Sequence, residues 1–330
     1  MQHIVNQGVK LLILNFIHVP KTAGTSFRKA AEQVYGARRI VYDYNHRSAE
    51  TSPLVQEFIY EKQAPDPWGL LAACGKSNVA FIGGHFRADK YTPLCGVNNT
   101  ITFLREPVQR LVSEYRHFVR HNGYKDTLES FYRLPRMQNR MTSILSRVPL
   151  EALGFLGTTE RYSECLALLD QRLCVQLPRR EDNVGDRSST ELLEVSDDHR
   201  QAMLELNDKD VRLFRRAERL LEQRLALFKE GKPWVHGVVT ETRPRKIAGW
   251  AWTDLGDAPV DVEIRVNDEV VAVAPATAYV PALARWSVPR AGFVGFECRG
   301  SFAVGDKVEC CILKTGQLLG GPGRIRQPAS

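Results

Sequence analysis

The stretch LLILNFIHVPKTAGTSFRKAAEQVY, residues 11–35, contains an apolar run, a short polar turn and a helical pattern. The run from Leu11 to Val19 is almost continuously apolar, which is typical of a strand covered on both faces within a parallel sheet. Pro20 ends the run, and Lys21 to Gly24 form the turn. Apolar residues then recur every three or four positions, which predicts an amphipathic helix: Phe27, Ala30, Ala31, Val34 and Tyr35.

Two more apolar segments predict buried strands, Val79 to Ile82, closed by Gly83-Gly84, and Thr100 to Leu104. Pro107 stands where a helix would open after the second of them. Residues 134–170 have a helical pattern with short breaks, residues 181–198 are polar and predict a loop, and residues 211–228 predict one long amphipathic helix. Strands that alternate with amphipathic helices predict an α/β fold with a parallel sheet.

The pattern changes after Gly231-Lys232-Pro233. Short β-branched segments follow, separated by turn signals such as Asn267-Asp268, and these indicate strands. They are residues 238–239, 247–252, 260–266, 270–274, 293–298 and 308–313. We therefore predict two domains, an α/β domain over residues 1–232 and a β-sandwich over residues 233–330.

Composition sets the broad class of protein. The 330 residues are 43% hydrophobic and 25% charged, which excludes a disordered tail, a fibre and a disulfide-dense miniprotein. The seven cysteines are scattered without a C-x-x-C pair, so we expect reduced thiols rather than disulfides or a zinc knuckle. No apolar run reaches the roughly 18 residues of a membrane span, and residues 9–19 lack a signal-peptide cleavage site. We expect a cytoplasmic protein and leave open a peripheral contact with a membrane.

The net charge of +7 is unevenly distributed. From Val235 onward there are 11 basic and 10 acidic residues, which leaves 34 basic and 28 acidic residues before it. An anionic partner for the first domain follows, although charge alone does not choose between a nucleic acid, a membrane surface and a small polyanion.

The turn after the first strand has the features of a phosphate-binding loop. A helix that starts there exposes unpaired N–H groups at the positive end of its dipole. Gly24 allows close approach of an anion, Thr25 and Ser26 add hydroxyl groups, and Lys21 adds a charge. The alternative is a basic turn whose helix is capped by Thr25 or Ser26. The G-x-x-x-x-G-K-[ST] pattern of a Walker A loop is absent.

A second anion contact is predicted at the end of the third strand. Arg105 follows Leu104 directly, and an arginine at the carboxyl end of a sheet strand points into the ligand crevice, where its fork can grip a phosphate. Ser113 lies eight residues later on the next helix.

These two segments resemble those of a known family. HVPKTAGTS, residues 18–26, resembles the 5′-phosphosulfate loop of sulfotransferases that use 3′-phosphoadenosine-5′-phosphosulfate (PAPS), and FLREPVQRLVSEY, residues 103–115, resembles their 3′-phosphate segment. Residues 83–86, 138–142 and 155–161 resemble the carbohydrate branch of the family, of the heparan sulfate 2-O-sulfotransferase type. The resemblance covers residues 16–228 and implies a P-loop-type, three-layer fold.

The resemblance also implies roles for individual residues. Lys21 would contact the bridging oxygen of the leaving phosphate. The 5′-phosphate would be lined by Thr22, Gly24, Thr25 and Ser26, and the 3′-phosphate by Arg105 and Ser113. No Walker B aspartate is evident, so we expect no metal.

His85 is the best candidate for a general base. It follows Gly83-Gly84 at the end of a buried strand and should face the same crevice, and an ordinary imidazole pKa near 6.5 suits proton acceptance at neutral pH. A histidine in a Gly-His motif has this role in the resembling branch. The alternative is a structural histidine at a strand end, with His18 as the rival base. His117 and His121 are four apart on a helix, but no third metal ligand accompanies them.

We therefore predict an enzyme that transfers a sulfuryl group from PAPS to a hydroxyl of a carbohydrate or glycolipid, without a nucleic-acid partner. A nucleotide kinase of the same fold and a non-catalytic nucleotide- or polyanion-binding protein remain as alternatives. Trp250 and Trp252 are assigned to the core, with a sugar-stacking surface as the alternative. The arginines at 212, 215, 216 and 219 are assigned to a solvated helix face, with a binding surface as the alternative.

Overall fold

The first domain is built on a five-stranded parallel sheet. The computed structural model describes residues 13–178, 195–321 and 323–327. The strand order is β2-β3-β1-β4-β5, and every pair of neighbouring strands is parallel. The strands are β1 (Leu14–Ile17), β2 (Ile40–Asp43), β3 (Phe81–Gly84), β4 (Thr100–Leu104) and β5 (Phe155–Thr158).

Alternation along the strands sends different side chains to the two faces of this sheet. One face carries phenylalanines and packs against α1, α8 and the C-terminal half of α11: Phe16, Phe81, Phe103 and Phe155. The other face carries the aliphatic residues that follow them: Ile17, Ile82, Leu104 and Leu156. Both faces are buried, so the fold is the predicted three-layer α/β arrangement.

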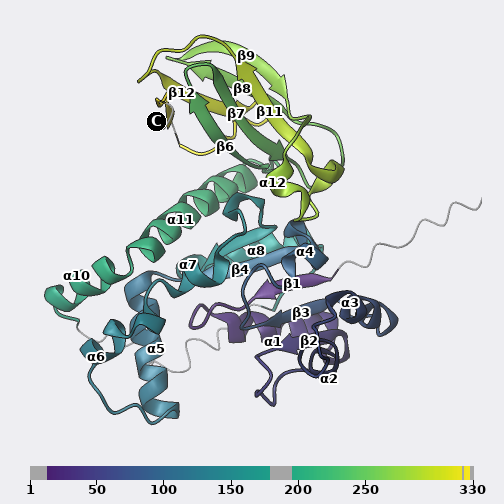
Figure 1. Cartoon of the computed structure of the whole chain (residues 1–330), viewed down its shortest axis with the longest axis vertical. Helices are drawn as coiled ribbons and strands as arrows, with labels where there is room; N and C mark the ends of the chain where they lie inside the picture. The colour runs from purple at the N-terminus through teal and green to yellow at the C-terminus, as the bar shows by residue number, and fades with distance from the viewer. Residues whose placement is uncertain (1–12, 179–194, 322, 328–330) are drawn as a thin grey trace, which may run out of the picture.

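The helices cover the two faces of the sheet, and α5, α6 and α10 extend away from it (Figure 1). They are α1 (Gly24–Tyr35), α2 (Pro53–Val55), α3 (Pro67–Lys76), α4 (Thr92–Cys95), α5 (Pro107–His121), α6 (Leu128–Arg133), α7 (Arg140–Leu145), α8 (Tyr162–Leu173), α10 (Asp197–Leu206), α11 (Asp208–Lys229) and, in the second domain, α12 (Pro281–Ala284). Pro107 opens α5 as predicted. Among the described residues, no helix is both long and apolar enough to cross a membrane.

The C-terminal part is the predicted β-sandwich. Its two four-stranded sheets have the orders β10-β11-β7-β6 and β13-β12-β8-β9. The strands are β6 (His236–Arg243), β7 (Lys246–Trp252), β8 (Asp261–Val266), β9 (Glu269–Pro275), β10 (Ala278–Tyr279), β11 (Phe293–Arg299), β12 (Lys307–Ile312) and β13 (Gly323–Arg324). Apolar residues of both sheets form one core between them.

Several local predictions were wrong. Gly83 and Gly84 belong to β3 and do not close it. Both positions favour glycine, because a side chain at Gly83 would strike the Phe81 ring and one at Gly84 would strike the backbone of Asp43. Residues 155–158 were assigned to a helical region and form β5, and β2 was missed altogether. The polar stretch 181–198 lies largely outside the described residues, and its last two residues begin α10.

The two parts of the chain share a hydrophobic core. Trp250, Trp252 and Trp286 are no more than 4% exposed and belong to the same apolar cluster as the aliphatic face of the sheet. The rings of Trp250 and Trp252 stack with centroids 4.8 Å apart, and Trp252 Nε1 donates to Asn98 Oδ1 at 3.0 Å. These tryptophans therefore pack in the core, and the alternative of a sugar-stacking surface is wrong.

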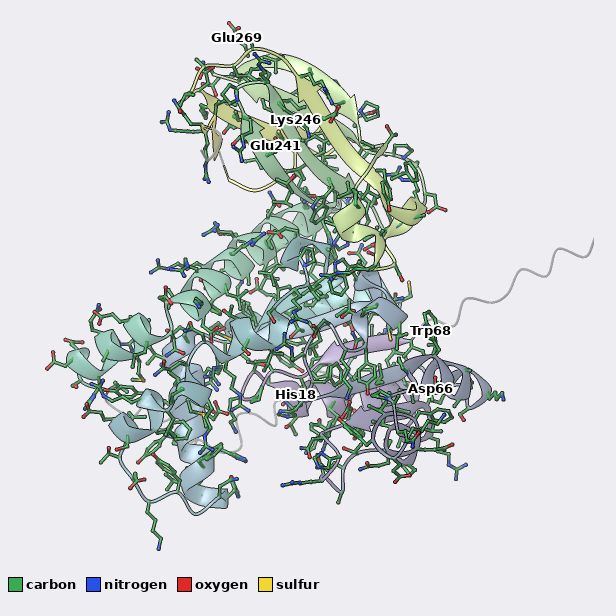
Figure 2. All side chains as sticks on the ribbon, in the orientation of Figure 1. His18, Asp66, Trp68, Glu241, Lys246 and Glu269 are labelled. Carbon is green, nitrogen blue, oxygen red and sulfur yellow. The ribbon has the colours of Figure 1, made fainter. Side chains whose placement is uncertain are left out.

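We expect Trp252→Ala to lower the free energy of unfolding by about 3–5 kcal/mol, because a fully buried indole leaves a cavity at the contact between the two parts. Urea unfolding followed by circular dichroism measures the loss. Trp68→Ala is the control, since Trp68 lies at the surface on α3 and is 68% exposed (Figure 2). Equal effects of the two substitutions would show that the shared core does not stabilise the chain.

Candidate active site

The loop between β1 and α1 has an unusual backbone. Lys21 and Ala23 both have positive φ angles, 67° and 61°. The Thr22 hydroxyl donates to the backbone oxygen of Val19 at 2.8 Å, and Thr22 is wholly buried. The side chain of Thr22 therefore stabilises the loop itself, and its contact with a 5′-phosphate remains a prediction.

The N-terminus of α1 is open. Its cap residue is Ala23, whose side chain cannot accept a hydrogen bond, and the first turn contains no acidic residue. This geometry argues against a turn capped by Thr25 or Ser26, because both lie inside the helix. Thr25 is exposed and Ser26 is half-buried. An uncapped helix start of this kind favours an anion.

Gly24 allows a close contact with His18. A Cβ atom built at Gly24 would lie 1.9 Å from His18 Cδ2, so any other residue would displace the imidazole. The glycine thus packs the start of α1 against a histidine at the carboxyl end of β1. It is buried, which leaves Lys21, Thr25 and Ser26 as the more accessible residues of the loop.

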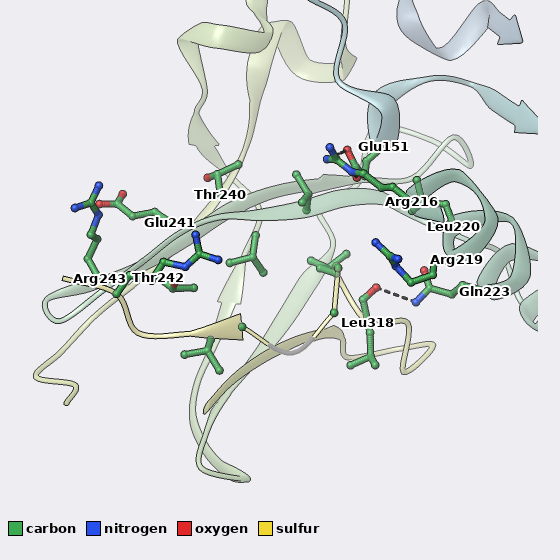
Figure 3. A pocket seen from close by; sticks show the side chains of 18 of the residues that line it. Glu151, Arg216, Arg219, Leu220, Gln223, Thr240, Glu241, Thr242, Arg243 and Leu318 are labelled. Carbon is green, nitrogen blue, oxygen red and sulfur yellow. Dashed lines mark hydrogen bonds and ion pairs between the residues drawn. The ribbon is translucent and has the colours of Figure 1, made fainter. Parts of the chain in front are cut away.

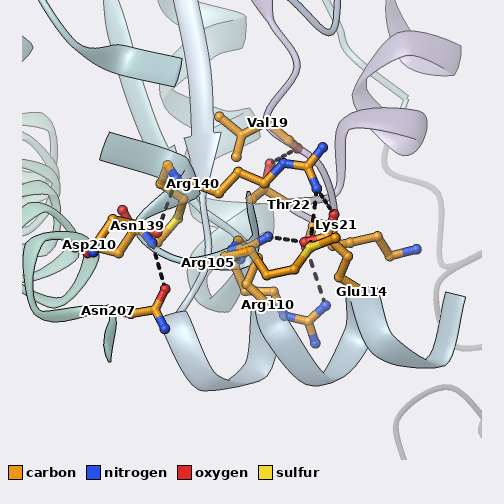
Figure 4. Close-up of polar contacts among 12 residues, drawn as sticks. Val19, Lys21, Thr22, Arg105, Arg110, Glu114, Asn139, Arg140, Asn207 and Asp210 are labelled. Atoms are coloured by element: carbon orange, nitrogen blue, oxygen red, sulfur yellow. Dashed lines mark hydrogen bonds and ion pairs between the residues drawn. The ribbon is translucent and has the colours of Figure 1, made fainter. Parts of the chain in front are cut away.

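Arg105 lies against the loop between β1 and α1 (Figure 4), and its contact with a 3′-phosphate remains a prediction. Its Nη1 donates to the backbone oxygen of Lys21 at 3.5 Å. Burial lowers the pKa of Lys21, with Arg105 and Arg120 adding to the effect and Glu114 opposing it. Burial also lowers the pKa of Arg105, although Glu160 and Glu106 oppose it. A bound anion would therefore stabilise the charged forms of Lys21 and Arg105, which burial disfavours. Ser113 is half-buried on α5, and its contact with a 3′-phosphate remains a prediction.

A buried carboxylate on α5 organises the cations and was not predicted. Glu114 is 2% exposed, accepts a hydrogen bond from Arg110 Nη1 at 2.5 Å and forms an ion pair with Arg140 (Figure 4). One carboxylate therefore faces two guanidinium groups, with Lys21 also within its electrostatic reach. The balance of charge around Glu114 remains positive.

The segment 138–142 positions Arg140 through reciprocal capping. The Asp210 carboxylate accepts from the backbone N–H groups of Met141 at 3.1 Å and Thr142 at 2.7 Å, at the start of α7. In return, Asn139 Oδ1 accepts from the backbone N–H groups of Lys209 and Asp210 at the start of α11. The two helix starts are thereby locked together, which fixes the direction of Arg140.

His85 and His18 lie side by side at the carboxyl end of the sheet. Their ring centroids are 4.3 Å apart, and His18 Nδ1 is 3.2 Å from the Tyr44 hydroxyl. His18 is buried, whereas the His85 side chain is open to solvent. The surrounding protein still desolvates His85 enough to lower its pKa to about 4, with Arg140 and Arg28 adding to the effect. Burial also lowers the pKa of His18 well below its ordinary value, so both imidazoles are neutral at pH 7 and His85 is the accessible one.

Asp43 is a second residue that sequence reasoning missed. Its backbone oxygen accepts from the N–H of His85 at 3.0 Å. Its buried carboxylate accepts from Lys90 at 2.5 Å, Tyr91 at 2.6 Å and Tyr60 at 2.7 Å. Burial alone would raise the pKa of Asp43, but these hydrogen bonds outweigh it and lower the pKa. The cluster anchors the end of β2 and, through it, the backbone of His85.

His117 and His121 lie together on α5, with ring centroids 4.8 Å apart. Burial and the charge of Lys21 lower the pKa of His117. Within the described ranges, no group of three or more His, Cys, Asp and Glu side chains could hold a metal ion. The two histidines lie near the C-terminal end of α5, whose last turn also contains Arg120.

Residues 9–172 match the model of the sulfotransferase family. The match covers just under half of the chain and includes His18, Lys21, His85, Arg105 and Ser113. It supports a sulfotransferase family, and sulfuryl transfer as the activity, for this part of the chain. Neither the comparison with curated proteins nor that with solved structures gave a match.

Proposed function

We propose that the protein transfers a sulfuryl group from PAPS to a hydroxyl of a carbohydrate or glycolipid acceptor. One observation carries the proposal: the uncapped start of α1, Lys21 and Arg105 meet at the carboxyl end of the sheet, where burial lowers the pKa of both cations. A nucleotide that carries an anionic group at both the 3′ and the 5′ position of its ribose would compensate them. Residues 138–142 and 155–161 support the carbohydrate branch by resemblance.

The residues present fit this donor. Lys21, Thr25, Ser26 and the N–H groups of the α1 start would hold the 5′-phosphosulfate, and Arg105 with Ser113 the 3′-phosphate. PAPS supplies the activated sulfuryl group. Lys21 and the N–H groups are preorganised for the charge that develops on a leaving phosphate, which is the arrangement that lowers a transition-state barrier most.

His85 would accept the proton of the acceptor hydroxyl. It is open to solvent and neutral at pH 7, but its pKa of about 4 in the free protein makes it a weaker base than the ordinary imidazole that the sequence led us to expect. Negative charge of a bound donor would offset the influence of Arg140 and Arg28 and raise the basicity of His85. His18 is less suited, because it is buried between Gly24 and Tyr44.

A comparison of nucleotides tests the proposal against its alternatives. We expect adenosine 3′,5′-bisphosphate to bind the full chain more tightly than ADP, because Arg105 serves a 3′-phosphate; the reverse order would favour a kinase. Transfer of label from ³⁵S-PAPS to a panel of carbohydrate, lipid and phenolic acceptors then separates an enzyme from a non-catalytic binding protein.

We expect Arg105→Ala to weaken PAPS binding by roughly 2–4 kcal/mol, because a charge-assisted contact in a partly dry crevice is lost. Binding of adenosine 5′-phosphosulfate, which lacks the 3′-phosphate, should change much less. Isothermal titration calorimetry measures both, with the exposed Arg133 as a control for Arg→Ala. Equal losses for the two ligands would place Arg105 elsewhere in the mechanism.

A further inference from the structure

A groove of about 1030 Å³ lies between α11 and the β-sandwich and shares no lining residue with the candidate active site. Arg216, Arg219 and Gln223 extend into it from α11, and β6 faces them with Thr240 to Arg243 (Figure 3). The groove has the size of a pocket for a small ligand or a few residues of a polymer.

Both carboxylates that line this groove are already neutralised. Glu151 accepts two hydrogen bonds of 2.5 Å from Arg216, and the buried Arg224 lies within its electrostatic reach. Glu241 forms an ion pair with Lys246 at 3.0 Å. Neither carboxylate is therefore available to compensate the other cations of the groove.

Three arginines remain. Arg219 and Arg326 are exposed, and their side chains have no hydrogen bond or ion pair with the described part of the chain. Arg243 is half-buried and donates to the backbone oxygen of Gln327 at 3.4 Å, a neutral partner. By contrast Arg212, on the same helix but outside the groove, pairs with Asp208 at 2.7 Å. Arg212 thus has an acidic partner on its own helix, whereas Arg219 faces the groove.

The other lining residues indicate which kind of anion would fit. Thr240 and Thr242 use their hydroxyl protons on backbone oxygens, which leaves hydroxyl oxygens that can accept from a ligand. Aromatic side chains are absent from the described residues that line the groove, whereas proteins that bind single-stranded nucleic acids stack bases on such side chains. Arginines, hydroxyl oxygens and compensated carboxylates together suit a ligand that is both acidic and rich in hydroxyl groups.

We propose that this groove binds an acidic oligosaccharide, one that carries carboxylate or sulfate groups, as a distant part of the acceptor chain. The inference rests on the proposed function and deepens it by naming the acceptor as an acidic polysaccharide. Contacts remote from the reacting hydroxyl can supply binding energy that positions a long acceptor.

The experiment uses fluorescently labelled heparin and hyaluronan hexasaccharides with the full chain, at near-physiological salt. One probe carries sulfates and carboxylates, the other carboxylates alone. We expect Arg219→Gln and Arg243→Gln each to weaken binding of at least one probe about tenfold, as for loss of one charge-assisted contact. Arg212→Gln removes the same charge from the same helix and should leave binding unchanged. Thermal melting confirms that each variant is folded.

The proposal would be overturned if neither probe binds, if Arg212→Gln weakens binding as much as Arg219→Gln, or if a single-stranded oligonucleotide binds through Arg219 more tightly than both probes. Lys21→Ala separates this proposal from the proposed function, because it should slow transfer by a factor on the order of 10²–10³ and leave the Arg219-dependent binding intact. If the wild type binds both probes through Arg219 but transfers no sulfuryl group to any acceptor, the groove stands and the proposed function fails.

Discussion

Replacing Lys21 by alanine should reduce the rate of sulfuryl transfer by a factor on the order of 10²–10³, the usual cost of removing one preorganised group that stabilises transition-state charge. The side chain is half-buried beside Arg105 and carries the only ammonium group of the phosphate loop. Single-turnover measurement with ³⁵S-PAPS reports the chemical step separately from product release.

The matched control is Lys29→Ala, because Lys29 is an exposed lysine on α1, the helix that follows the loop. It should keep close to full activity. The melting temperatures of both variants should stay near that of the wild type, because neither lysine belongs to the apolar core. A Lys21 variant with nearly normal turnover would remove the loop from the mechanism.

The strand, turn and helix around Lys21 could be predicted because their pattern is local. A buried strand, a turn with Lys21 and Gly24, and an amphipathic helix follow one another within about 25 residues, and each part has its own periodicity. Arg105 was predicted for a related reason, since the carboxyl ends of parallel strands meet at one edge of the sheet. Neither prediction required knowledge of which strands are neighbours.

The charged framework around the loop could not be predicted in this way. Glu114 and Arg140 are 26 residues apart, and Asn139 and Asp210 pair across about 70 residues. Such pairs depend on how α5, α7 and α11 pack, and a single sequence does not show that. Asp43 was missed together with β2, because the four residues of β2 include only two aliphatic ones and end in a charge, unlike the apolar runs around β1 and β3.

The sequence alone did not decide whether Trp250 and Trp252 are buried or form a surface for sugars. Trp250 and Trp252 alternate with Ala251 in β7, a spacing that fits a surface for sugars as well as a packed face. Only the position of the sandwich against Asn98 and the aliphatic side of the sheet decides between them. The balanced charge of the sandwich gave no sign that one of its edges, with α11, forms a basic groove.

His85→Ala should lower the rate of transfer by a factor on the order of 10²–10⁴ at pH 7.5, the range for loss of a general base. Because the side chain is open to solvent, added imidazole should restore part of the activity. His121→Ala, at an exposed histidine on α5, should have little effect. A His18→Asn variant that loses activity and is rescued by imidazole, while His85→Ala stays active, would assign the base to His18 instead.

The protonation of His85 gives an independent test that needs no turnover. Desolvation and the charges of Arg140 and Arg28 lower its pKa to about 4, so the free protein should hold the ring neutral at pH 5.5 and protonate it only as the pH falls through about 4. An NMR titration of the histidine rings, assigned with His85→Ala, measures this directly. Because the depression is partly electrostatic, adenosine 3′,5′-bisphosphate should raise the pKa, since its negative charge favours the imidazolium. A His85 pKa that the nucleotide leaves unmoved would separate His85 from the anion site.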